Sequence, residues 1–364
     1  MKNRRSFYDK TRRAKKMWIS PDNQNLRYTG RIDWSDAKAP VWVFPCTSVQ
    51  MRITGSILKI HVKNKNNYWE NYLGCIVDQV QSCCYLKNEG ETVWELALPE
   101  NETGEHEVLV FKRQDACHHL TILGFEIEDG AKFLQLPEPP KRKIEVYGDS
   151  VSAGEVSEAL ESLGESDPEH RGGYSNSWYS YSWMTARRLQ AQIHDIAQGG
   201  IPLLNGTGWF SAPDYLGMES MWDKVCYNPA FGKTTKWNFV DYTPQVVIVA
   251  IGQNDANPED YMKEDYDGTE GVHWRAEYQK FLAKLRSTYP KAEIICMTTL
   301  LGHDAAWDRA IGEVVEKMKD DHITHYLFKR NGCGTKGHLR IPEASEMAVE
   351  LSAYIESRNM EGWE

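Results

Sequence analysis

The sequence contains no long apolar run: no stretch approaches the roughly eighteen residues that a membrane-spanning helix needs. It also lacks an excess of positive charge. Its formal net charge of −10 argues against nucleic acid or an anionic membrane as a partner. Residues 1–16 are basic, but they lack the apolar core and the cleavage site of a secretory leader. We interpret them as a solvated, partly mobile terminus rather than a nucleic-acid contact, and we expect a cytoplasmic protein.

Repeated cysteine spacing is absent as well. The eight cysteines are scattered and show no repeated C-x-x-C pattern, so neither a zinc ribbon nor a disulfide framework is indicated. The run Cys117-His118-His119 suggests a metal cluster. However, adjacent side chains on a strand point to opposite faces and cannot converge on one ion without distortion. We therefore expect reduced cysteines and no metal or organic cofactor.

The length of 364 residues favours two domains. Residues 1–136 are predicted to form a β-sandwich of the jelly-roll type, because short runs of alternating apolar residues recur with no helical period between them. Residues 137–143 hold three prolines in four positions, which predicts a stiff, extended linker. The strands predicted before this linker are 41–44, 48–53, 57–62, 72–77, 92–96, 106–111 and 120–127.

Residues 144–364 follow a different pattern, in which strands alternate with helices. This alternation predicts a parallel sheet with helices on both faces, a three-layer α/β/α domain. The almost wholly apolar run 246–251 is typical of a strand buried on both faces. The other predicted elements are strands 144–147, 192–197 and 293–298, a short apolar stretch at 324–328, and helices near 176–190, 271–288, 305–319 and 342–358.

Three of the predicted parallel strands end in loops that contain glycine. The carboxyl ends of neighbouring parallel strands meet at one edge of a sheet, so these loops are expected to converge. Together they offer a hydroxyl nucleophile and N–H donors for a tetrahedral oxyanion, as serine acyl transfer requires. His338 precedes the last predicted helix and could supply the base, although a histidine in a loop is more often a solvated surface residue. The loops are Gly148-Asp149-Ser150, Gly199-Gly200 and Gly252-Gln253-Asn254-Asp255.

This combination resembles the SGNH, or GDSL-like, hydrolase superfamily over roughly residues 144–355, and the resemblance implies a flavodoxin-like α/β/α fold. Its four marker residues would be Ser150, Gly200, Asn254 and His338. The resemblance implies that Ser150 and His338 are catalytic and that Ser150, Gly200 and Asn254 form the oxyanion hole. Gly30-Arg31-Ile32, Val43-Phe44-Pro45 and a small β domain before Gly-Asp-Ser are similar to the second family of carbohydrate esterases.

One position departs from the pattern of the superfamily. Its members usually have an aspartate three residues before the histidine, and here that position is Thr335. The acid normally fixes the histidine tautomer, a role that a backbone carbonyl can also perform. We therefore expect a Ser150–His338 dyad, as in some members of the esterase family. An acid from elsewhere, Asp304 or Glu343, is the alternative.

Several other side chains of the same loops have competing interpretations. Asp149 and Asp255 are more simply explained as turn-forming residues than as catalytic acids. Trp209, Trp307 and Trp178 are candidates for stacking on sugar rings, but each could equally be a core residue.

The resemblance implies a serine esterase that removes acetyl groups from hemicellulose sugars. The substrate would be an acetylated oligosaccharide of the xylo or manno type, with no nucleic acid or membrane partner. Two alternatives stay open: a lipase or thioesterase built on the same residues, and a glycan-binding protein whose α/β domain is inert. The sugar, the hydroxyl position and the oligomeric state stay undetermined.

Overall fold

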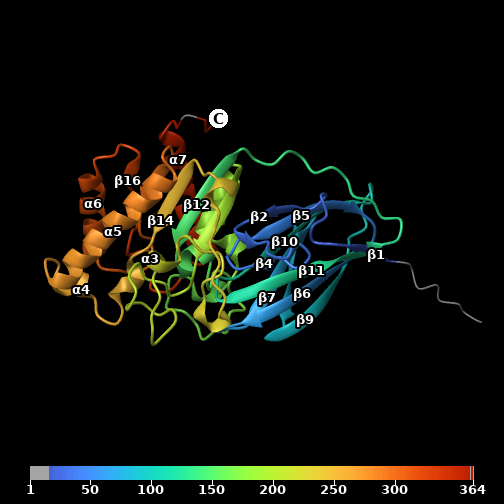
Figure 1. Cartoon of the computed structure of the whole chain (residues 1–364), viewed down its shortest axis with the longest axis horizontal. Coiled ribbons are helices and arrows are strands. Elements are labelled where there is room, and N and C mark those ends of the chain that lie inside the picture. Colours follow the sequence, from blue (N-terminus) through green and yellow to red (C-terminus); the bar gives the residue numbers. More distant parts are fainter. Residues whose placement is uncertain (1–15, 361, 364) are drawn as a thin grey trace, which may run out of the picture.

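The computed structural model describes residues 16–360 and 362–363, and its N-terminal half is a β-sandwich (Figure 1). One sheet has the strand order β3-β4-β11-β6-β9, with β1 also paired to β11, and the other has the order β2-β5-β10-β7-β8. All pairs within the two sheets are antiparallel. The predicted sandwich is thereby confirmed. Of residues 1–16, interpreted as a partly mobile terminus, 1–15 lie outside the described residues, and Lys16 begins strand β1. The strands are β1 (Lys16–Ile19), β2 (Arg27–Thr29), β3 (Ile32–Asp33), β4 (Val41–Trp42), β5 (Ser48–Thr54), β6 (Ile57–Asn66), β7 (Asn71–Val77), β8 (Val80–Leu86), β9 (Glu89–Ala97), β10 (Glu105–Lys112) and β11 (His118–Glu128).

The burial of these strands follows their sequence pattern. Leu58, Ile60 and Val62 alternate along β6 and are fully buried between the sheets. Strand β8 was missed by the sequence analysis because it lies at a sheet edge, where only Leu86 of its residues is buried. An edge strand with little buried surface does not need the apolar alternation by which strands are recognised.

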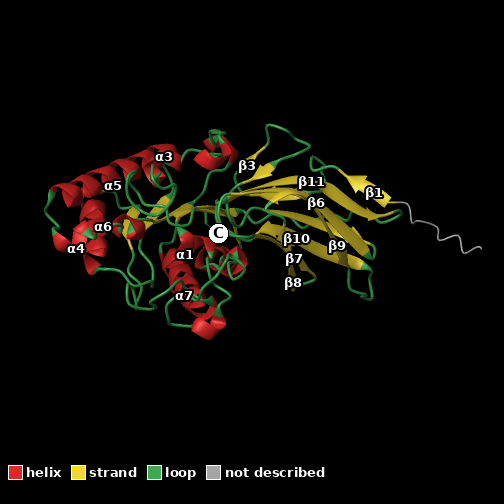
Figure 2. Cartoon of the chain, turned by 90° about the horizontal axis from the view of Figure 1, so that it is seen from below, coloured by secondary structure: helices red, strands yellow, loops and turns green. Residues whose placement is uncertain are grey.

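The C-terminal half is a five-stranded parallel sheet with the order β13-β12-β14-β15-β16. Helices α3 and α5 lie on one face and α1 and α7 on the other (Figure 2). The predicted three-layer domain is thereby confirmed. Its strands are β12 (Arg142–Gly148), β13 (Ala191–Ala197), β14 (Val246–Ala250), β15 (Glu293–Cys296) and β16 (Ile323–His325). Its α-helices are α1 (Ser150–Ala153), α2 (Tyr181–Arg188), α3 (Met218–Met221), α4 (Tyr261–Glu264), α5 (Thr269–Thr288), α6 (Ala305–Met318) and α7 (Ile341–Ser357). Short 3₁₀ helices span Leu160–Ser162, Ser177–Tyr179, Pro229–Phe231, Phe239–Asp241 and Gln253–Ala256.

The strand order places a crevice at one point of the sheet. The first strand, β12, lies between the second and the third, so the chain reverses its direction of winding there. In sheets of this kind, ligands bind beyond the carboxyl ends of the two strands at the reversal. Those ends are Gly148 of β12 and Ala250 of β14.

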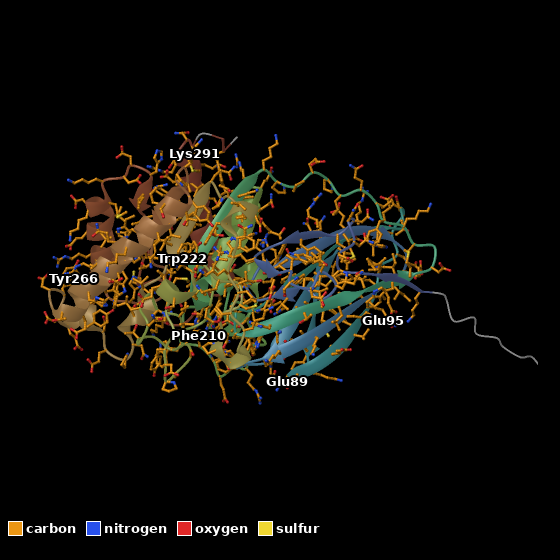
Figure 3. All side chains as sticks on the ribbon, in the orientation of Figure 1. Glu89, Glu95, Phe210, Trp222, Tyr266 and Lys291 are labelled. Atoms are coloured by element: carbon orange, nitrogen blue, oxygen red, sulfur yellow. The ribbon has the colours of Figure 1, made fainter. Side chains whose placement is uncertain are left out.

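The two halves share a buried interface. Arg31 of the sandwich is fully buried, and its Nη2 lies 3.0 Å from Glu145 Oε1 on β12. Val43 and Phe44 of the sandwich belong to the same apolar cluster as Phe210 of the α/β half, which lies near the junction in Figure 3. Removing one partner of a buried ion pair typically destabilises a protein by about 3–5 kcal/mol, so breaking this contact would weaken the junction between the two halves. None of the helices in the described part of the chain has the length and apolar composition that a bilayer crossing requires.

Candidate active site

Ser150 is the first residue of α1, directly beyond the end of β12. Asp149 caps this short helix, because its Oδ1 accepts the Val151 N–H at 3.0 Å. A side chain at Gly148 would collide with Ser152 Oγ, since an added Cβ would lie 2.1 Å from it. The sharp turn leaves Ser150 7% exposed at the edge of the sheet. Asp149 therefore has the turn-forming role expected of it.

His338 lies in the loop before α7, with its ring between Ser150 and a carboxylate. Its Nε2 is 2.7 Å from Ser150 Oγ, and its Nδ1 is 2.5 Å from Asp167 Oδ2. A carboxylate can only accept, so Nδ1 carries the proton and Nε2 is left to accept the serine proton. These three side chains have the arrangement of a serine–histidine–aspartate triad.

This geometry corrects the expected dyad. Asp167, rather than a backbone carbonyl, accepts the Nδ1 proton of His338. Thr335, at the position where the acid was sought, instead accepts the Gly302 N–H with its backbone carbonyl at 2.9 Å. The two alternative acids are also elsewhere: Asp304 caps α6, and Glu343 caps α7 by accepting the Arg340 N–H at 2.9 Å.

Sequence reasoning missed Asp167 because the acid enters from a separate loop, 171 residues before the histidine. Nothing in the local Ser166-Asp167-Pro168 sequence distinguishes it from an ordinary turn. One signal is visible only in the structure. A Cβ at Gly337 would lie 2.5 Å from Asp167 Oδ1, so the glycine before the histidine makes room for the carboxylate.

The Asp167 carboxylate is held by other donors besides the imidazole. Its Oδ1 accepts the His338 backbone N–H and Arg340 Nη1, both at 2.9 Å. Arg340 is itself fully buried, and its Nε donates to the Ala159 carbonyl at 3.1 Å. The acid is thereby oriented from two sides before any substrate binds.

These contacts shift the pKa values of the pair in opposite directions. Burial lowers the pKa of His338, but the hydrogen bond to Asp167 and the charges of Glu155 and Asp167 outweigh it and raise the pKa to about 9. Burial raises the pKa of Asp167, but the hydrogen bond and charge of His338 lower it to about 2. The pair therefore favours an imidazolium beside a carboxylate.

Three residues with N–H donors, Ser150, Gly200 and Asn254, line one cavity from different loops. In the described part of the chain, no acceptor bonds the backbone N–H of Ser150 or of Gly200. Gly200 has a positive φ of 71° and follows β13. Asn254 follows β14, and its Nδ2 donates to Asp149 Oδ2 at 3.1 Å with one of its two hydrogens. Ser150, Gly200, Asn254 and His338 all line one cavity.

The cavity has a volume of about 830 Å³, and both halves of the chain form its wall. Trp209 lines it and is 65% exposed, as a stacking surface would be. The prediction for Trp307 is wrong, because this side chain is fully buried and bonds Asp260 Oδ1 at 2.9 Å. Trp178 does not line the cavity either, since it packs under the Arg187 guanidinium, 3.7 Å from its ring centroid. The lining residues are Tyr68, Trp69, Asp149, Ser150, Glu155, Gly199, Gly200, Trp209, Phe210, Gln253, Asn254, Ala256, Asp260, Leu301, Gly302, His303 and His338.

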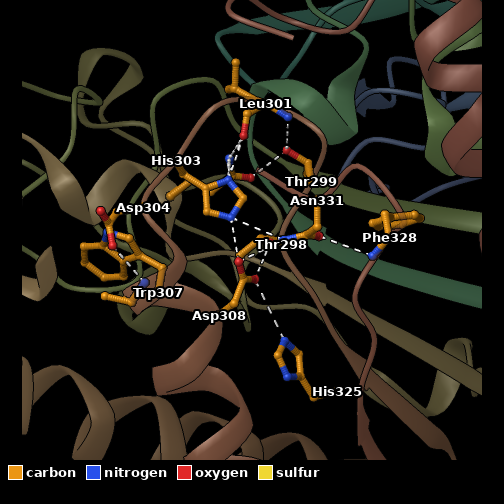
Figure 4. Close-up of polar contacts among 12 residues, drawn as sticks. Thr298, Thr299, Leu301, His303, Asp304, Trp307, Asp308, His325, Phe328 and Asn331 are labelled. Carbon is orange, nitrogen blue, oxygen red and sulfur yellow. Dashed lines mark hydrogen bonds and ion pairs between the residues drawn. The ribbon is translucent and has the colours of Figure 1, made fainter. Parts of the chain in front are cut away.

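A second histidine, His303, stands in the same wall (Figure 4). Its Nδ1 lies 2.7 Å from the Leu301 carbonyl, and its Nε2 lies 2.9 Å from Asp308 Oδ2. Burial lowers the pKa of His303, but the hydrogen bond and charge of Asp308 raise it above its usual value. Both ring nitrogens have acceptors, so this imidazole has none left for a substrate proton.

The described residues do not offer a set of ligands for a bound metal ion. Residues 16–360 and 362–363 contain no group of three or more histidine, cysteine or acidic side chains arranged to hold an ion. All eight cysteines lie in this part of the chain and are unpaired.

Comparison with known proteins finds a match to a family model and to several relatives. The model described as "Carbohydrate esterase 2 N-terminal" matches residues 28–137. The chain is similar to the cellulase/esterase CelE of Acetivibrio thermocellus, with 28% identity over 94% of this chain and 40% of that protein. It is also similar to an acetylxylan esterase / glucomannan deacetylase of Cellvibrio japonicus, with 25% identity over 93% of this chain and 90% of the other.

A solved structure agrees over nearly the whole fold. It is a family two carbohydrate esterase from Clostridium thermocellum in complex with cellohexaose, with a TM-score of 0.76 and 26% identity. The match covers 93% of this chain and 100% of that one. Residues 28–137 thus match the N-terminal model of carbohydrate esterase family 2, and the sandwich and the parallel sheet together have the fold of a family two carbohydrate esterase.

Proposed function

We propose that this protein is a serine esterase that removes O-acetyl groups from acetylated hemicellulose oligosaccharides of the xylo or manno type. The observation that carries the proposal is the chain of contacts from Asp167 through His338 to Ser150, which faces an open cavity. The curated relatives are named for esterase and acetylxylan esterase / glucomannan deacetylase activity, which supports the acetyl group and the sugar class.

The proposed reaction has two acyl-transfer steps. His338 Nε2 takes the proton of Ser150 Oγ as the oxygen forms a bond to the acetyl carbon, and the carbonyl oxygen becomes an oxyanion. The N–H groups of Ser150, Gly200 and Asn254 stabilise that oxyanion. As the bond between the acetyl carbon and the sugar oxygen breaks, His338 returns the proton to the departing sugar oxygen. Water, deprotonated by His338, then attacks the acetyl-serine. The bond to Ser150 Oγ breaks as His338 returns the proton to that oxygen, and acetic acid leaves and ionises to acetate in solvent.

The charge of the cavity supports an uncharged substrate. Its acidic lining residues are Asp149, Glu155 and Asp260, whereas none of the lysines and arginines that the structure describes lines it. Burial raises the pKa of Glu155 to about 7, so this group is at least partly ionised in neutral solution. A neutral acetylated sugar meets no repulsion there, and the acetate anion, once formed, is repelled.

Acetate release tests the proposal directly. The purified protein is incubated with acetylated xylo- and manno-oligosaccharides, and NMR follows which acetyl groups disappear. Ser150→Ala is expected to abolish release while the melting temperature stays the same. Ser287→Ala is the matched control, because this serine lies on the exposed side of α5 and bonds only the Lys284 carbonyl.

Two results would contradict the proposal. Equal rates with p-nitrophenyl acetate and with long-chain p-nitrophenyl esters would favour a lipase or thioesterase. Glycan binding by the wild type without any acetate release would favour a non-catalytic binding protein. A cytoplasmic location stays a prediction, which fractionation of the producing cell would test.

A further inference from the structure

A carboxylate of the β-sandwich contacts the loop that carries a proposed oxyanion-hole donor. Asp115 lies between β10 and β11 and is 6% exposed. Its Oδ2 accepts the Gly199 N–H at 2.6 Å and Gln198 Nε2 at 2.9 Å. The same oxygen accepts the Tyr68 hydroxyl at 3.0 Å. Asp115 therefore joins the sandwich to the loop that follows β13.

The backbone beside Asp115 adds a second connection. The Ala116 N–H donates to the carbonyl of Ala197, the last residue of β13, at 3.2 Å. A side chain at Gly199 cannot fit, because an added Cβ would lie 2.6 Å from Asp115 Oδ2 and 3.0 Å from Glu155 Oε2. The loop is thus pressed against the sandwich at Gly199, one residue before Gly200.

The consequence concerns the two successive N–H groups. Gly199 gives its N–H to Asp115, whereas the N–H of Gly200 has no acceptor in the described part of the chain. The Gly200 carbonyl accepts the N–H groups of Trp209 and Phe210, at 2.9 and 3.2 Å. The Gly199 contact therefore holds the loop from the sandwich side, and these two bonds hold it from the α/β side.

We propose that Asp115 is a positioning residue for the proposed ester hydrolysis: it holds the Gly199-Gly200 loop so that the Gly200 N–H is aimed at the oxyanion. The β-sandwich then takes part in catalysis rather than only walling the cavity. This inference rests on the proposed function. A misplacement of about 1 Å in a catalytic group can cost about a hundredfold in rate, so a positioning contact has a measurable effect.

The contact requires a carboxylate rather than an amide. While Asp115 Oδ2 accepts the bonds to the loop, Oδ1 accepts the Cys117 N–H at 3.3 Å. Asparagine would turn an NH₂ group towards one of these donors in either orientation. The fully buried Lys112 contributes a nearby positive charge, as its Nζ donates to the Gln114 carbonyl at 2.8 Å and to that of Asp115.

The test compares Asp115→Asn with Asp33→Asn. Asp33 is a matched control, because it is a buried sandwich carboxylate that crosses the same interface, to Lys233 Nζ at 2.5 Å, without touching the loop. For Asp115→Asn we expect kcat with p-nitrophenyl acetate to fall about 10- to 100-fold with little change in KM. For Asp33→Asn we expect kcat within about twofold of wild type, because it moves no group of the site.

A tetrahedral inhibitor separates positioning from general loosening. Methylboronic acid bonded to Ser150 mimics the oxyanion, so its affinity should fall with kcat/KM in Asp115→Asn. Gly199→Ala disturbs the same contact from the α/β side, because the added Cβ would lie 2.6 Å from Asp115 Oδ2, and it changes no residue of the sandwich. If Asp115→Asn folds poorly, Gly199→Ala should still show a lower kcat, an unchanged KM and weaker boronate binding.

The outcomes distinguish the two proposals. No ester hydrolysis by the wild type, or activity retained in Ser150→Ala, would overturn the proposed function. An active wild type with Asp115→Asn and Gly199→Ala equal to it in kcat and boronate affinity would overturn the role of Asp115 alone. A loss confined to KM would also overturn it, because it would assign Asp115 to substrate binding.

Discussion

Two histidines in the wall of one cavity are each paired with an aspartate, and they differ in what the second ring nitrogen contacts. In both pairs the carboxylate raises the pKa of the imidazole above its usual value. The second nitrogen of His338 meets the Ser150 hydroxyl, whereas that of His303 meets the Leu301 carbonyl. A hydroxyl can give up a proton and a carbonyl cannot. An ion pair and a shifted pKa therefore do not by themselves make a catalytic base; the partner of the other nitrogen decides.

The surroundings of the two aspartates show the same difference. Asp308 accepts bonds from Thr298 Oγ1 at 2.5 Å and from Asn331 Nδ2 at 2.9 Å, within a network that links the ends of β15 and β16 to α6 (Figure 4). Asp167 instead connects the loop after α1 to the loop before α7. The first network joins elements of the fold near the cavity, and the second orients His338, the proposed base.

The largest difference is expected when each histidine is replaced. His338→Gln should lower kcat about 10⁵- to 10⁶-fold, because the serine loses its base. His303→Gln should retain activity within about tenfold and lower the melting temperature, since the buried Asp308 carboxylate loses its hydrogen bond to the imidazole. Steady-state assays and thermal melts of both variants check this. Equal losses of activity in the two variants would contradict the assignment of His338 as the base and of His303 as a structural residue.

The second largest difference in kcat is expected between variants of the two aspartates. Asp167→Asn is expected to lower kcat about 10⁴-fold, because an amide can donate to Nδ1 and so favour the wrong tautomer. Asp308→Asn should affect stability and leave kcat within about tenfold. A kcat near wild type in Asp167→Asn, measured with p-nitrophenyl acetate, would restore the dyad interpretation.

The pH dependence follows from the pKa of His338. The base must be neutral, so kcat/KM should rise with pH and reach half of its maximum near pH 9. Removal of the Asp167 charge should move this midpoint to lower pH. The stabilising contribution of the imidazolium is present below its unfolded pKa of 6.5 and is lost as pH rises through about 9. A flat profile between pH 6 and 10 would contradict the base assignment.

The smallest effects are expected at the cavity rim. Trp209→Ala should raise KM for acetylated oligosaccharides several-fold and leave p-nitrophenyl acetate unaffected, because only a longer substrate reaches the exposed indole.

Glu155→Gln should lower the pKa of His338, since the charge of Glu155 helps to raise it. The pH profiles of kcat/KM for the wild type and for Glu155→Gln, measured side by side, should differ, with the midpoint of the variant at the lower pH.

Much of the molecule could be predicted from particular residues. Alternation along 57–62 and the apolar run 246–251 predicted strands that the structure contains. Strand β8 and the complete burial of Trp307 could not be predicted in this way. An exposed edge carries little pattern, and whether a tryptophan faces a cavity depends on which helix packs over it.

By itself the sequence determined the two-domain fold and the order of Ser150, Gly200, Asn254 and His338 along the chain, because strand periodicity and glycine turns are local properties. Only the tertiary structure decided which acid contacts His338 and which sandwich residue holds the Gly199-Gly200 loop. Asp167 and Asp115 lie 171 and 84 residues from their partners. Contacts over such separations arise from packing of the whole chain, and no local pattern records them.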